Sequence, residues 1–469
     1  MEPVIKIGEW TRANRIGSDD QPDIRLADEI NKIKSGRIDT IVVLDDDPTG
    51  TQTVYDVPVL TDWETDTLNT EIIGGTSLFF ILTNSRSMGE HEAEELAVTI
   101  GKRLHRISHE SGKKIFVISR SDSTLRGHYP AECVALETGL GWADTVHFII
   151  PAFFEGGRYT IRDIHYVQQG KELVPAAQTS YAQDKVFGFK NSNLTRWVEE
   201  KTKGKVRWHD VHSISLEDIR EMPVDRLIEK LQGYEPGSVC IVNATHYEDL
   251  QKFTLALIQS GTRPMCRTAA SFVKAVSGLP PRDLLTRREL SVPSSLGGLI
   301  IVGSYVPKTT EQVEYLITNA TADSMELKVM ELLNVDDQKE FVRQYVKELE
   351  RFLKSGRDLV LYTSRELIAT DSPEENLLIG NRVSQSLTQI VASLQVRPKY
   401  IVSKGGITAS DVATKGLSVR KALIMGQILA GIPVWRLGPE SKYPGLPYVV
   451  FPGNVGNGQA LFDVAELLK

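Results

Sequence analysis

Three consecutive carboxylates follow a short apolar run near the start of the chain, in the stretch DTIVVLDDDPTG. The proline and glycine after them predict a tight turn, which keeps the acids at the end of a buried strand. Carboxylates placed there can bind a polyol, hold Mg²⁺ or accept a proton from a hydroxyl group. A solvated turn is the alternative, but three adjacent negative charges repel one another and favour a function. We select Asp45 and Asp46 as the candidate catalytic residues: one of them would be the base or, with Asp46 as the candidate, a ligand of Mg²⁺-bound water.

A second polar segment, SRSDSTLRGH at 119–128, also follows an apolar run, and PAFFEGGRY at 151–159 adds a further arginine. A guanidinium group can bind a carboxylate through two parallel hydrogen bonds, and hydroxyl side chains can bind sugar hydroxyls. The alternative for both segments is a surface turn or a capped helix start. The predicted substrate-binding residues are Arg120, Asp122, Ser123, Thr124, Arg126 and Arg158.

Three glycine-containing turns follow apolar runs in the second half: GSYVPKT at 303–309, SKGGITAS at 403–410 and FPGNVGNG at 451–458. The first is not a Walker A loop, because Lys308 stands where that motif needs glycine. Backbone N–H groups in such turns can bind phosphate. Each turn alone is weak evidence, but together they favour a nucleotide site. The predicted cofactor-binding residues are Ser304, Gly405, Gly406, Ile407, Thr408, Gly453 and Asn454.

Composition and missing motifs exclude several other classes of protein. The net charge of -7 leaves no broad basic surface for nucleic acid. The three cysteines are too scattered for a disulfide framework or a zinc site. No apolar run reaches the roughly 20 residues of a membrane span, and the first residues do not resemble a signal peptide. We therefore expect a cytoplasmic protein whose partner is a small molecule, with no nucleic acid and no membrane, and self-assembly stays open.

Apolar runs alternate with helical patterns along most of the chain. This alternation predicts an α/β protein of two domains, each with a parallel or mixed sheet flanked by helices, and a ligand cleft between them. Strands are expected at 39–46, 77–83, 114–119, 145–150, 238–244, 298–304, 326–330, 358–364, 400–406 and 448–454, and helices at 90–112, 308–320, 336–355 and 376–394. Residues 151–236 show a weaker pattern, which indicates an insertion with short elements.

The best boundary between the two domains is the stretch 278–298, which contains three prolines and no clean period. We expect a polar N-terminal arm at 1–36, a first α/β domain at 37–280, a linker at 281–297 and a second, nucleotide-binding α/β domain at 298–469.

The ordered set of motifs resembles the four-carbon acid sugar kinases. It consists of LDDDPTGTQ, SDSTLRGHYPAE, PAFFEGGRY with HYV, IVGS with PKTTEQ, SKGGITASDV and FPGNVGNG. The resemblance implies an ATP- and Mg²⁺-dependent kinase that phosphorylates a hydroxyl group of a tetronate, a 3-oxo-tetronate or a related short sugar acid. Its parts would be an N-terminal acid-sugar domain and a C-terminal nucleotide domain.

Some positions depart from the pattern of that family. Gln52 and Thr53 stand where a later acid is usual, and Lys404 and Ile407 flank the glycine pair. These departures keep a second hypothesis open, a nucleotide- or metabolite-binding regulator that has lost turnover. A sugar-acid oxidoreductase is less favoured, because the G-x-G-x-x-G fingerprint of dinucleotide binding with a downstream acid is missing.

Overall fold

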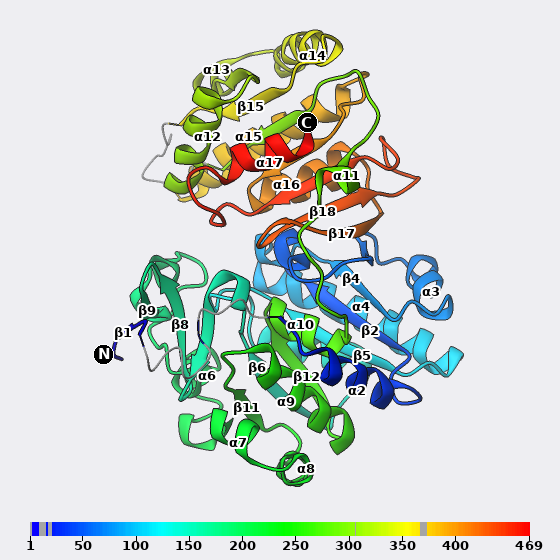
Figure 1. Ribbon diagram of the computed structural model, residues 1–469, viewed down its shortest axis with the longest axis vertical. Coiled ribbons are helices and arrows are strands. Elements are labelled where there is room, and N and C mark those ends of the chain that lie inside the picture. The colour runs from blue at the N-terminus through cyan, green and yellow to red at the C-terminus, as the bar shows by residue number, and fades with distance from the viewer. Residues whose placement is uncertain (1, 9–15, 17–20, 305, 366–372) are drawn as a thin grey trace. The chain divides into compact units, whose positions relative to one another are not determined.

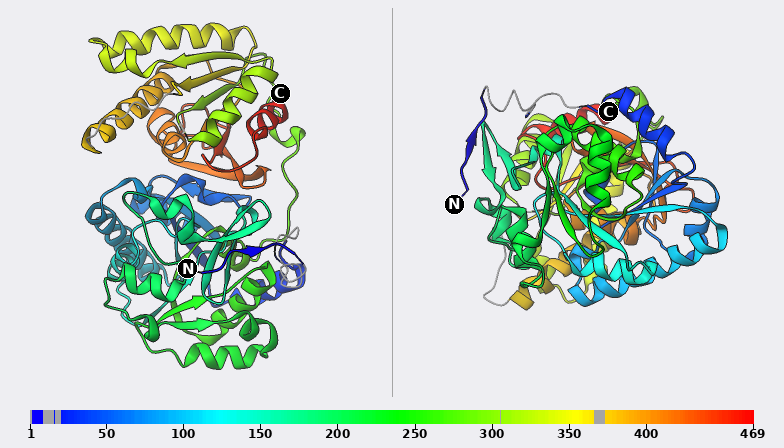
Figure 2. Two further views of the ribbon diagram at one scale, coloured as in Figure 1. Left: turned by 90° about the vertical axis from the view of Figure 1, so that its left-hand side faces the viewer. Right: turned by 90° about the horizontal axis from the view of Figure 1, so that it is seen from below.

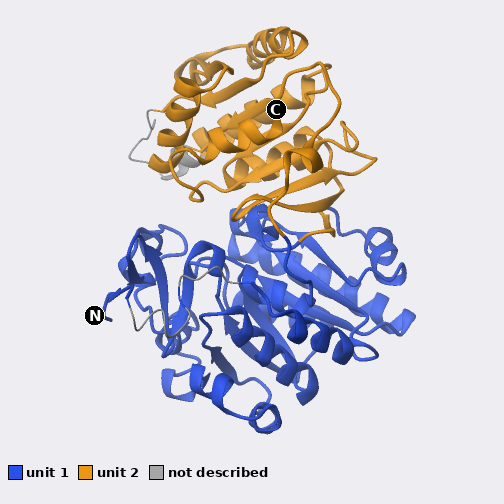
Figure 3. Cartoon of the chain, viewed as in Figure 1, with its two compact units in different colours: residues 1–54, 62–282 blue, residues 55–61, 283–469 orange. Residues whose placement is uncertain are grey.

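The computed structural model describes residues 2–8, 16, 21–304, 306–365 and 373–469 (Figure 1). The chain forms two compact units (Figure 3). Unit 1 comprises Met1–Val54 and Asp62–Arg282, and unit 2 comprises Tyr55–Thr61 and Asp283–Lys469. This confirms the predicted class, a two-domain α/β protein with flanked sheets.

The main sheet of unit 1 consists of parallel strands in the order β10-β11-β6-β12-β5-β2-β4. Their bounds are β2(Thr40–Asp45), β4(Leu78–Leu82), β5(Ile115–Arg120), β6(Thr145–Ile150), β10(His212–Ile214), β11(Val239–Val242) and β12(Arg263–Thr268). The strands expected in this half are all present. The sequence analysis did not find β10 and β12, because β10 is very short and RPMCRT in β12 lacks a continuous apolar run.

The order of strands in this sheet reverses at β2. The chain passes from β2 to β4 on one side, and later returns to β5 on the other side of β2. Ligands of open α/β sheets bind outside the carboxyl ends of the strands at such a reversal. Asp45 pairs in register with Arg120 at that point, so the first two polar segments meet there.

Helices pack in two groups around this sheet. The pair α4(Glu90–Ser111) and α5(Ala131–Leu140) forms one group, and α9(Tyr247–Ser260) packs against α2(Ile24–Lys34), α8(Val224–Gln232) and α10(Ala270–Ser277) in the other. The helix α4 has acidic residues in its first turn, which favour a helix N-terminus. It is followed by Gly112, whose left-handed φ of 69° is typical of the residue that ends a helix. Within the expected polar arm, α2 buries Ile30 completely.

Residues 151–236 form short elements, as expected. A small antiparallel sheet has the order β1-β9-β8-β7, with β1(Ile5–Lys6), β7(Arg158–Ile161), β8(Ile164–Gln169) and β9(Glu172–Pro175). The helices α6(Leu194–Lys201) and α7(Leu216–Glu221) follow it. The strand β1 adds residues of the N-terminal arm to the edge of this sheet.

Unit 2 contains a mixed sheet in the order β3-β17-β18-β19-β16-β13-β15-β14. The strands β19, β16, β13, β15 and β14 are parallel, and the others pair antiparallel. Their bounds are β3(Val57–Leu60), β13(Leu299–Val302), β14(Asp323–Leu327), β15(Leu359–Thr363), β16(Ile401–Lys404), β17(Lys421–Leu429), β18(Ile432–Leu437) and β19(Pro447–Phe451). Four of the strands expected here are present, but the one expected at 326–330 lies earlier, at Asp323–Leu327, and residues 329–330 begin the helix α13(Val329–Asn334). The strands β3, β17 and β18 were not expected.

Helices lie on both faces of the parallel part of this sheet (Figure 2). One group pairs α12(Pro307–Asn319) with α17(Ala460–Leu468), and the other pairs α14(Gln338–Lys354) with α15(Pro373–Ser393). The strand β13 lies between β15 and β16, so the strand order reverses there as well. None of the described helices combines the length and apolar composition that a membrane span requires.

The segment Tyr55–Thr61 belongs to unit 2, whereas the sequence analysis placed it in the first domain. Its strand β3 pairs antiparallel with β17, with Val59 opposite Ala422 and Leu60 opposite Lys421. Without β3, the strand β17 would be left with unpaired backbone groups along one side. The backbone of β3 pairs with these groups, and its side chains Val59 and Leu60 are buried.

Candidate functional site

Asp45, the last residue of β2, is held by the last residue of β5. The Arg120 guanidinium donates a hydrogen bond of 2.9 Å to Oδ1 of Asp45, and both side chains are buried. The other oxygen of Asp45, Oδ2, has no hydrogen-bond partner in the described part of the chain. Burial, together with the neighbouring charges of Asp46 and Asp47, outweighs Arg120 and raises the pKa of Asp45 to about 7.

Asp46 is anchored through one oxygen only. The hydroxyl of Ser121 donates to Oδ2 of Asp46, and Arg267 donates to that hydroxyl at 2.6 Å. Oδ1 of Asp46 accepts no hydrogen bond from the described residues, and it lies 3.6 Å from the guanidinium of Arg86. Burial outweighs the attraction of Arg86 and Arg267 and raises the pKa of Asp46.

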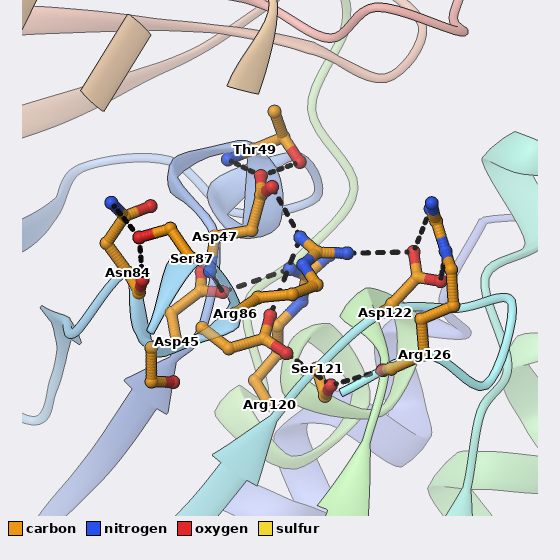
Figure 4. Close-up of polar contacts among 12 residues, drawn as sticks. Asp45, Asp47, Thr49, Asn84, Arg86, Ser87, Arg120, Ser121, Asp122 and Arg126 are labelled. Atoms are coloured by element: carbon orange, nitrogen blue, oxygen red, sulfur yellow. Dashed lines mark hydrogen bonds and ion pairs between the residues drawn. The ribbon is translucent and has the colours of Figure 1, made fainter. Parts of the chain in front are cut away.

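Arg86 joins three of the acids, and Figure 4 shows its contacts with Asp47 and Asp122. Its guanidinium forms ion pairs with Asp47, with Asp122 at 3.2 Å and with Asp46 at 3.6 Å. The Arg86 side chain retains 15% exposure, so it remains in contact with solvent at the sheet edge. A single guanidinium therefore connects the carboxylates after β2 with the segment after β5.

The segment after β5 folds around Asp122. Arg126 donates to both oxygens of Asp122, at 2.8 and 3.3 Å, and Thr124 donates to one of them. Burial alone would raise the pKa of Asp122, but Arg126 and Arg86 hold it below its usual range. In the same turn Leu125 adopts a φ of 69°, which is uncommon for a residue with a side chain.

Gly127 brings the backbone of this turn onto the acids. A methyl group in its place would lie 2.5 Å from the Arg267 guanidinium and 3.0 Å from Oδ2 of Asp46. Its φ of 122° also excludes most side chains. The turn thus covers Asp46 and its hydrogen-bond partner Ser121.

Two further predicted residues lie beside this turn. The backbone carbonyl of Ser123 accepts a hydrogen bond of 2.8 Å from Nε2 of His165, and burial lowers the pKa of that histidine to about 4. Arg158 donates to the carbonyl of Gly156 within its own turn. The ring of Tyr181 lies 5.2 Å from the Arg126 guanidinium and 6.0 Å from that of Arg158, so one aromatic ring connects the two arginines.

A cavity of about 20 Å³ lies next to the turn. Its polar lining includes Ser121, Asp122, Arg126, Arg267, Trp197 and Thr268. Nε1 of Trp197 and Oγ1 of Thr268 are buried without a hydrogen-bond partner in the described residues. A volume of this size holds about one water molecule or one hydroxyl group.

The predicted nucleotide-binding residues of unit 2 converge at the reversal of its strand order. A methyl group on Gly405 would lie 3.1 Å from Cβ of Ser304, and one on Gly303 would lie 2.2 Å from Oγ1 of Thr408. The hydroxyl of Thr309 lies 3.2 Å from the carbonyl of Gly453. The three glycine-containing turns therefore meet.

The remaining predicted residues of unit 2 lie at the outer side of these turns. Gly406 opens the short helix α16(Gly406–Asp411), and Ile407 follows it with 59% exposure. Asn454 is also exposed. Ile407 and Asn454 are therefore accessible to a ligand. Lys404, the last residue of β16, lies next to the glycine pair, and the sequence analysis assigned no role to it.

The described residues contain no cluster of three or more histidine, cysteine, aspartate or glutamate side chains that could hold a metal ion. Arg120 pairs with Asp45 and Arg86 pairs with Asp46 and Asp47, so these carboxylates already face cations. A water-mediated contact of Asp46 with Mg²⁺ stays a prediction.

Sequence reasoning missed Arg86 and Arg267 as residues of the site. Arg86 follows β4 by four residues, and the predicted strand at 77–83 could have indicated it. Arg267 lies inside β12, where its 2.8 Å hydrogen bond to Ser119 and 3.1 Å bond to Glu132 are invisible in the sequence. No local pattern distinguishes it from a surface arginine.

Comparison with known proteins identifies the two parts. Residues 41–276 match the family model of a sugar-binding N-terminal domain, and residues 299–461 match that of a nucleotide-binding C-terminal domain. The chain belongs to the four-carbon acid sugar kinase family. This confirms the resemblance seen in the motifs.

Solved structures of similar proteins share the fold. The Haemophilus influenzae protein HI1011, assigned to the family DUF1537, is 17% identical with a TM-score of 0.62, and the match covers 91% of this chain and 100% of that one. A Salmonella typhimurium LT2 protein, described as a candidate tRNA synthase, is 15% identical with a TM-score of 0.67, over 90% and 98% of the two chains. A search of curated proteins gave no match.

Proposed function

We propose that this member of the family transfers the γ-phosphoryl group of ATP to a hydroxyl group of a four-carbon sugar acid, such as a tetronate or a 3-oxo-tetronate. Unit 1 would bind the acid and unit 2 the nucleotide. Two matches support this division, because the acidic site lies within the sugar-binding match and the glycine turns lie within the nucleotide-binding match.

The observation that carries the proposal is the half-anchored carboxylate of Asp46. Ser121 fixes one oxygen, and the other accepts no hydrogen bond within the described residues. A general base needs such an arrangement, because one oxygen sets the orientation while the other takes the proton of the attacking hydroxyl. Burial raises the pKa of Asp46, which makes it a stronger base than an exposed aspartate. Asp45, which Arg120 holds in place, would lie beside Asp46 as a second buried carboxyl group.

The substrate carboxylate requires an accessible cation. Arg126 and Arg86 retain 22% and 15% exposure, whereas Arg120 is buried against Asp45. We therefore assign the carboxylate to Arg126 and Arg86, with Arg158 close to Tyr181, and give Arg120 the role of positioning Asp45. Asp122, Ser123 and Thr124 shape this turn, and the unpartnered Trp197 and Thr268 would bind a sugar hydroxyl.

The nucleotide would lie on the turns that contain Ser304, Gly405, Gly406, Ile407, Thr408, Gly453 and Asn454. Bound with the phosphates of ATP, Mg²⁺ would neutralise charge that develops during phosphoryl transfer. The residues of unit 2 contribute backbone N–H groups and hydroxyls that orient the phosphates.

The test is ADP release by the purified full chain with a panel of tetronates, 3-oxo-tetronates and branched oxo-acids. We expect turnover with at least one acid, and a loss of about 10²-fold or more in kcat for Asp46→Asn. Asp66→Asn, at an exposed acid in α3(Thr65–Ile73), is the matched control and should retain activity. Binding of both ligands without ADP release would overturn the kinase and favour a regulator.

Two accompanying expectations concern the setting of the reaction. We propose a role in carbohydrate metabolism in the cytoplasm, with a small-molecule acid as the partner. Self-assembly into a homo-oligomer is tested by the mass of the purified chain in solution.

A further inference from the structure

A lysine lies buried among the glycine-containing turns of unit 2. Lys404 is the last residue of β16, and its side chain has 0% exposure. In the sheet it stands opposite Val302 of β13 and Phe451 of β19, the strands that lead into the other two turns. Lys404 therefore lies at the place where all three glycine-containing turns begin.

The ammonium group of Lys404 contacts oxygen atoms and an aromatic ring. Nζ donates to the carbonyl of Pro452 at 3.0 Å and lies 3.5 Å from that of Gly453. It also lies 3.9 Å from the centre of the Phe451 ring. These contacts orient the ammonium group, but carbonyl dipoles and a ring carry no net negative charge.

The positive charge of Lys404 is not balanced by a carboxylate. In the described ranges of the chain no acidic side chain forms an ion pair with it, and the charged neighbour that acts on it is a second cation, Lys308. Lys308 itself pairs with Glu311 at 3.3 Å. A buried charge without a counter-ion is costly, so proteins pair such charges or use them to bind a ligand of opposite sign.

We propose that Lys404 is the buried cation of the nucleotide site, which fixes the Pro452–Gly453 turn and balances the negative charge of the bound polyphosphate. The inference rests on the nucleotide-binding part of the proposed function and not on the identity of the sugar acid. The ligand class is a nucleoside di- or triphosphate, because only the phosphates supply the missing charge. Lys404 is a positioning residue in this role, since its ammonium group is covered by the turn.

The experiment measures binding of adenosine, AMP, ADP and ATP by the full chain with titration calorimetry, without any sugar acid. In Lys404→Met, which keeps the length and removes the charge, we expect at least a tenfold loss of ATP affinity. The loss should grow with the number of phosphates and be absent for adenosine. Lys415→Met is the matched control, because Lys415 is 68% exposed and pairs with Asp411, and it should bind like the wild type.

Thermal unfolding separates this role from a purely structural one. Removal of an unbalanced buried charge should leave the unliganded protein as stable as the wild type or more stable. A fall in the unliganded melting temperature together with equal losses for adenosine and ATP would overturn the proposal, because that result describes a broken turn. Unchanged ATP affinity would overturn it as well.

A measurement on the wild type covers the case in which Lys404→Met does not fold. Burial lowers the pKa of Lys404 to about 7, and a polyphosphate beside it would raise that pKa. Binding of ADP at pH 8 should therefore take up protons, seen as a heat that depends on the ionisation enthalpy of the buffer. Absence of uptake would contradict the proposal. Absence of sugar-acid turnover with intact nucleotide binding would contradict the kinase alone.

Discussion

The backbone of Gly50 lies directly against the carboxylate of Asp45. A methyl group at Gly50 would stand 1.8 Å from Oδ2 of Asp45 and 2.3 Å from its Cγ. The turn that follows the three acids therefore closes over the first of them, and it does so only because residue 50 has no side chain. Asp45 cannot move away, because Arg120 holds its other oxygen.

From this contact we expect Gly50→Ala to destabilise unit 1 by about 1–3 kcal/mol, the usual cost of overpacking a buried site. The substitution should also separate Asp45 from Arg120 and lower kcat. Urea unfolding and ADP release measure the two effects. Gly8→Ala is the control, because nothing lies within 4 Å of the added methyl group. Equal stability of both variants would show that the turn relaxes freely.

The sequence predicted those parts of the site that follow an apolar strand directly. Asp45, Arg120, Ser304 and Gly405 lie at or just after the carboxyl ends of strands, as predicted, because parallel strands place these ends at one edge of a sheet. Arg267 was not found, because it lies within a strand whose sequence has no apolar run. The pairing partners could not be predicted either, because only the packed structure shows that Arg120 pairs with Asp45.

Arg86 was not selected from the sequence, and the structure shows that it contacts three carboxylates. It pairs with Asp46, Asp47 and Asp122, and lysine cannot bridge three carboxylates because it lacks the planar fork. In Arg86→Lys we expect at least a tenfold fall in kcat/KM for the sugar acid and no change in ATP affinity. Steady-state kinetics and calorimetry measure these values.

The control for Arg86 is Arg106→Lys, because Arg106 is exposed and bonds only to Thr65 in the described contacts. An equal loss of ATP affinity in Arg86→Lys would indicate that Arg86 binds the nucleotide and not the sugar acid. Full retention of kcat/KM would remove it from the site.

The raised pKa of Asp45 predicts a dependence of stability on pH. Its pKa is about 7 in the folded protein and 3.8 as the ordinary value, so between these values the folded state holds a proton that the unfolded state has released. Asp45 therefore makes the free energy of unfolding fall as pH rises from about 4 to about 7. The slope cannot exceed about 1.4 kcal/mol per pH unit for one group.

The measurement compares thermal unfolding of the wild type and Asp45→Asn between pH 4 and 8. Because asparagine does not titrate, the wild type should lose stability relative to the variant as pH rises, and the difference should level off above pH 7. Parallel curves for the two proteins would contradict the raised pKa.

The strand β3 links the acidic site and the nucleotide unit along the chain. Asp47 belongs to the turn of unit 1, and ten residues later Val57 begins a strand of the unit 2 sheet. Val57, Val59 and Leu60 are all buried, and β3 pairs with β17 over four residues. One strand of the nucleotide sheet is therefore supplied by a segment near the start of the sugar-binding sequence.

A fragment of residues 283–469 should consequently be an incomplete domain. Without β3, the edge of β17 exposes unpaired backbone groups beside apolar side chains, which favours aggregation. We expect this fragment to aggregate or to unfold at a lower temperature than the same fragment with residues 53–63 attached through a flexible linker. Light scattering and thermal unfolding measure the difference. A matched fusion with Val59→Asp should fail to rescue, because Val59 is fully buried. Equal solubility and melting temperature of the bare fragment would show that β17 is a stable edge by itself.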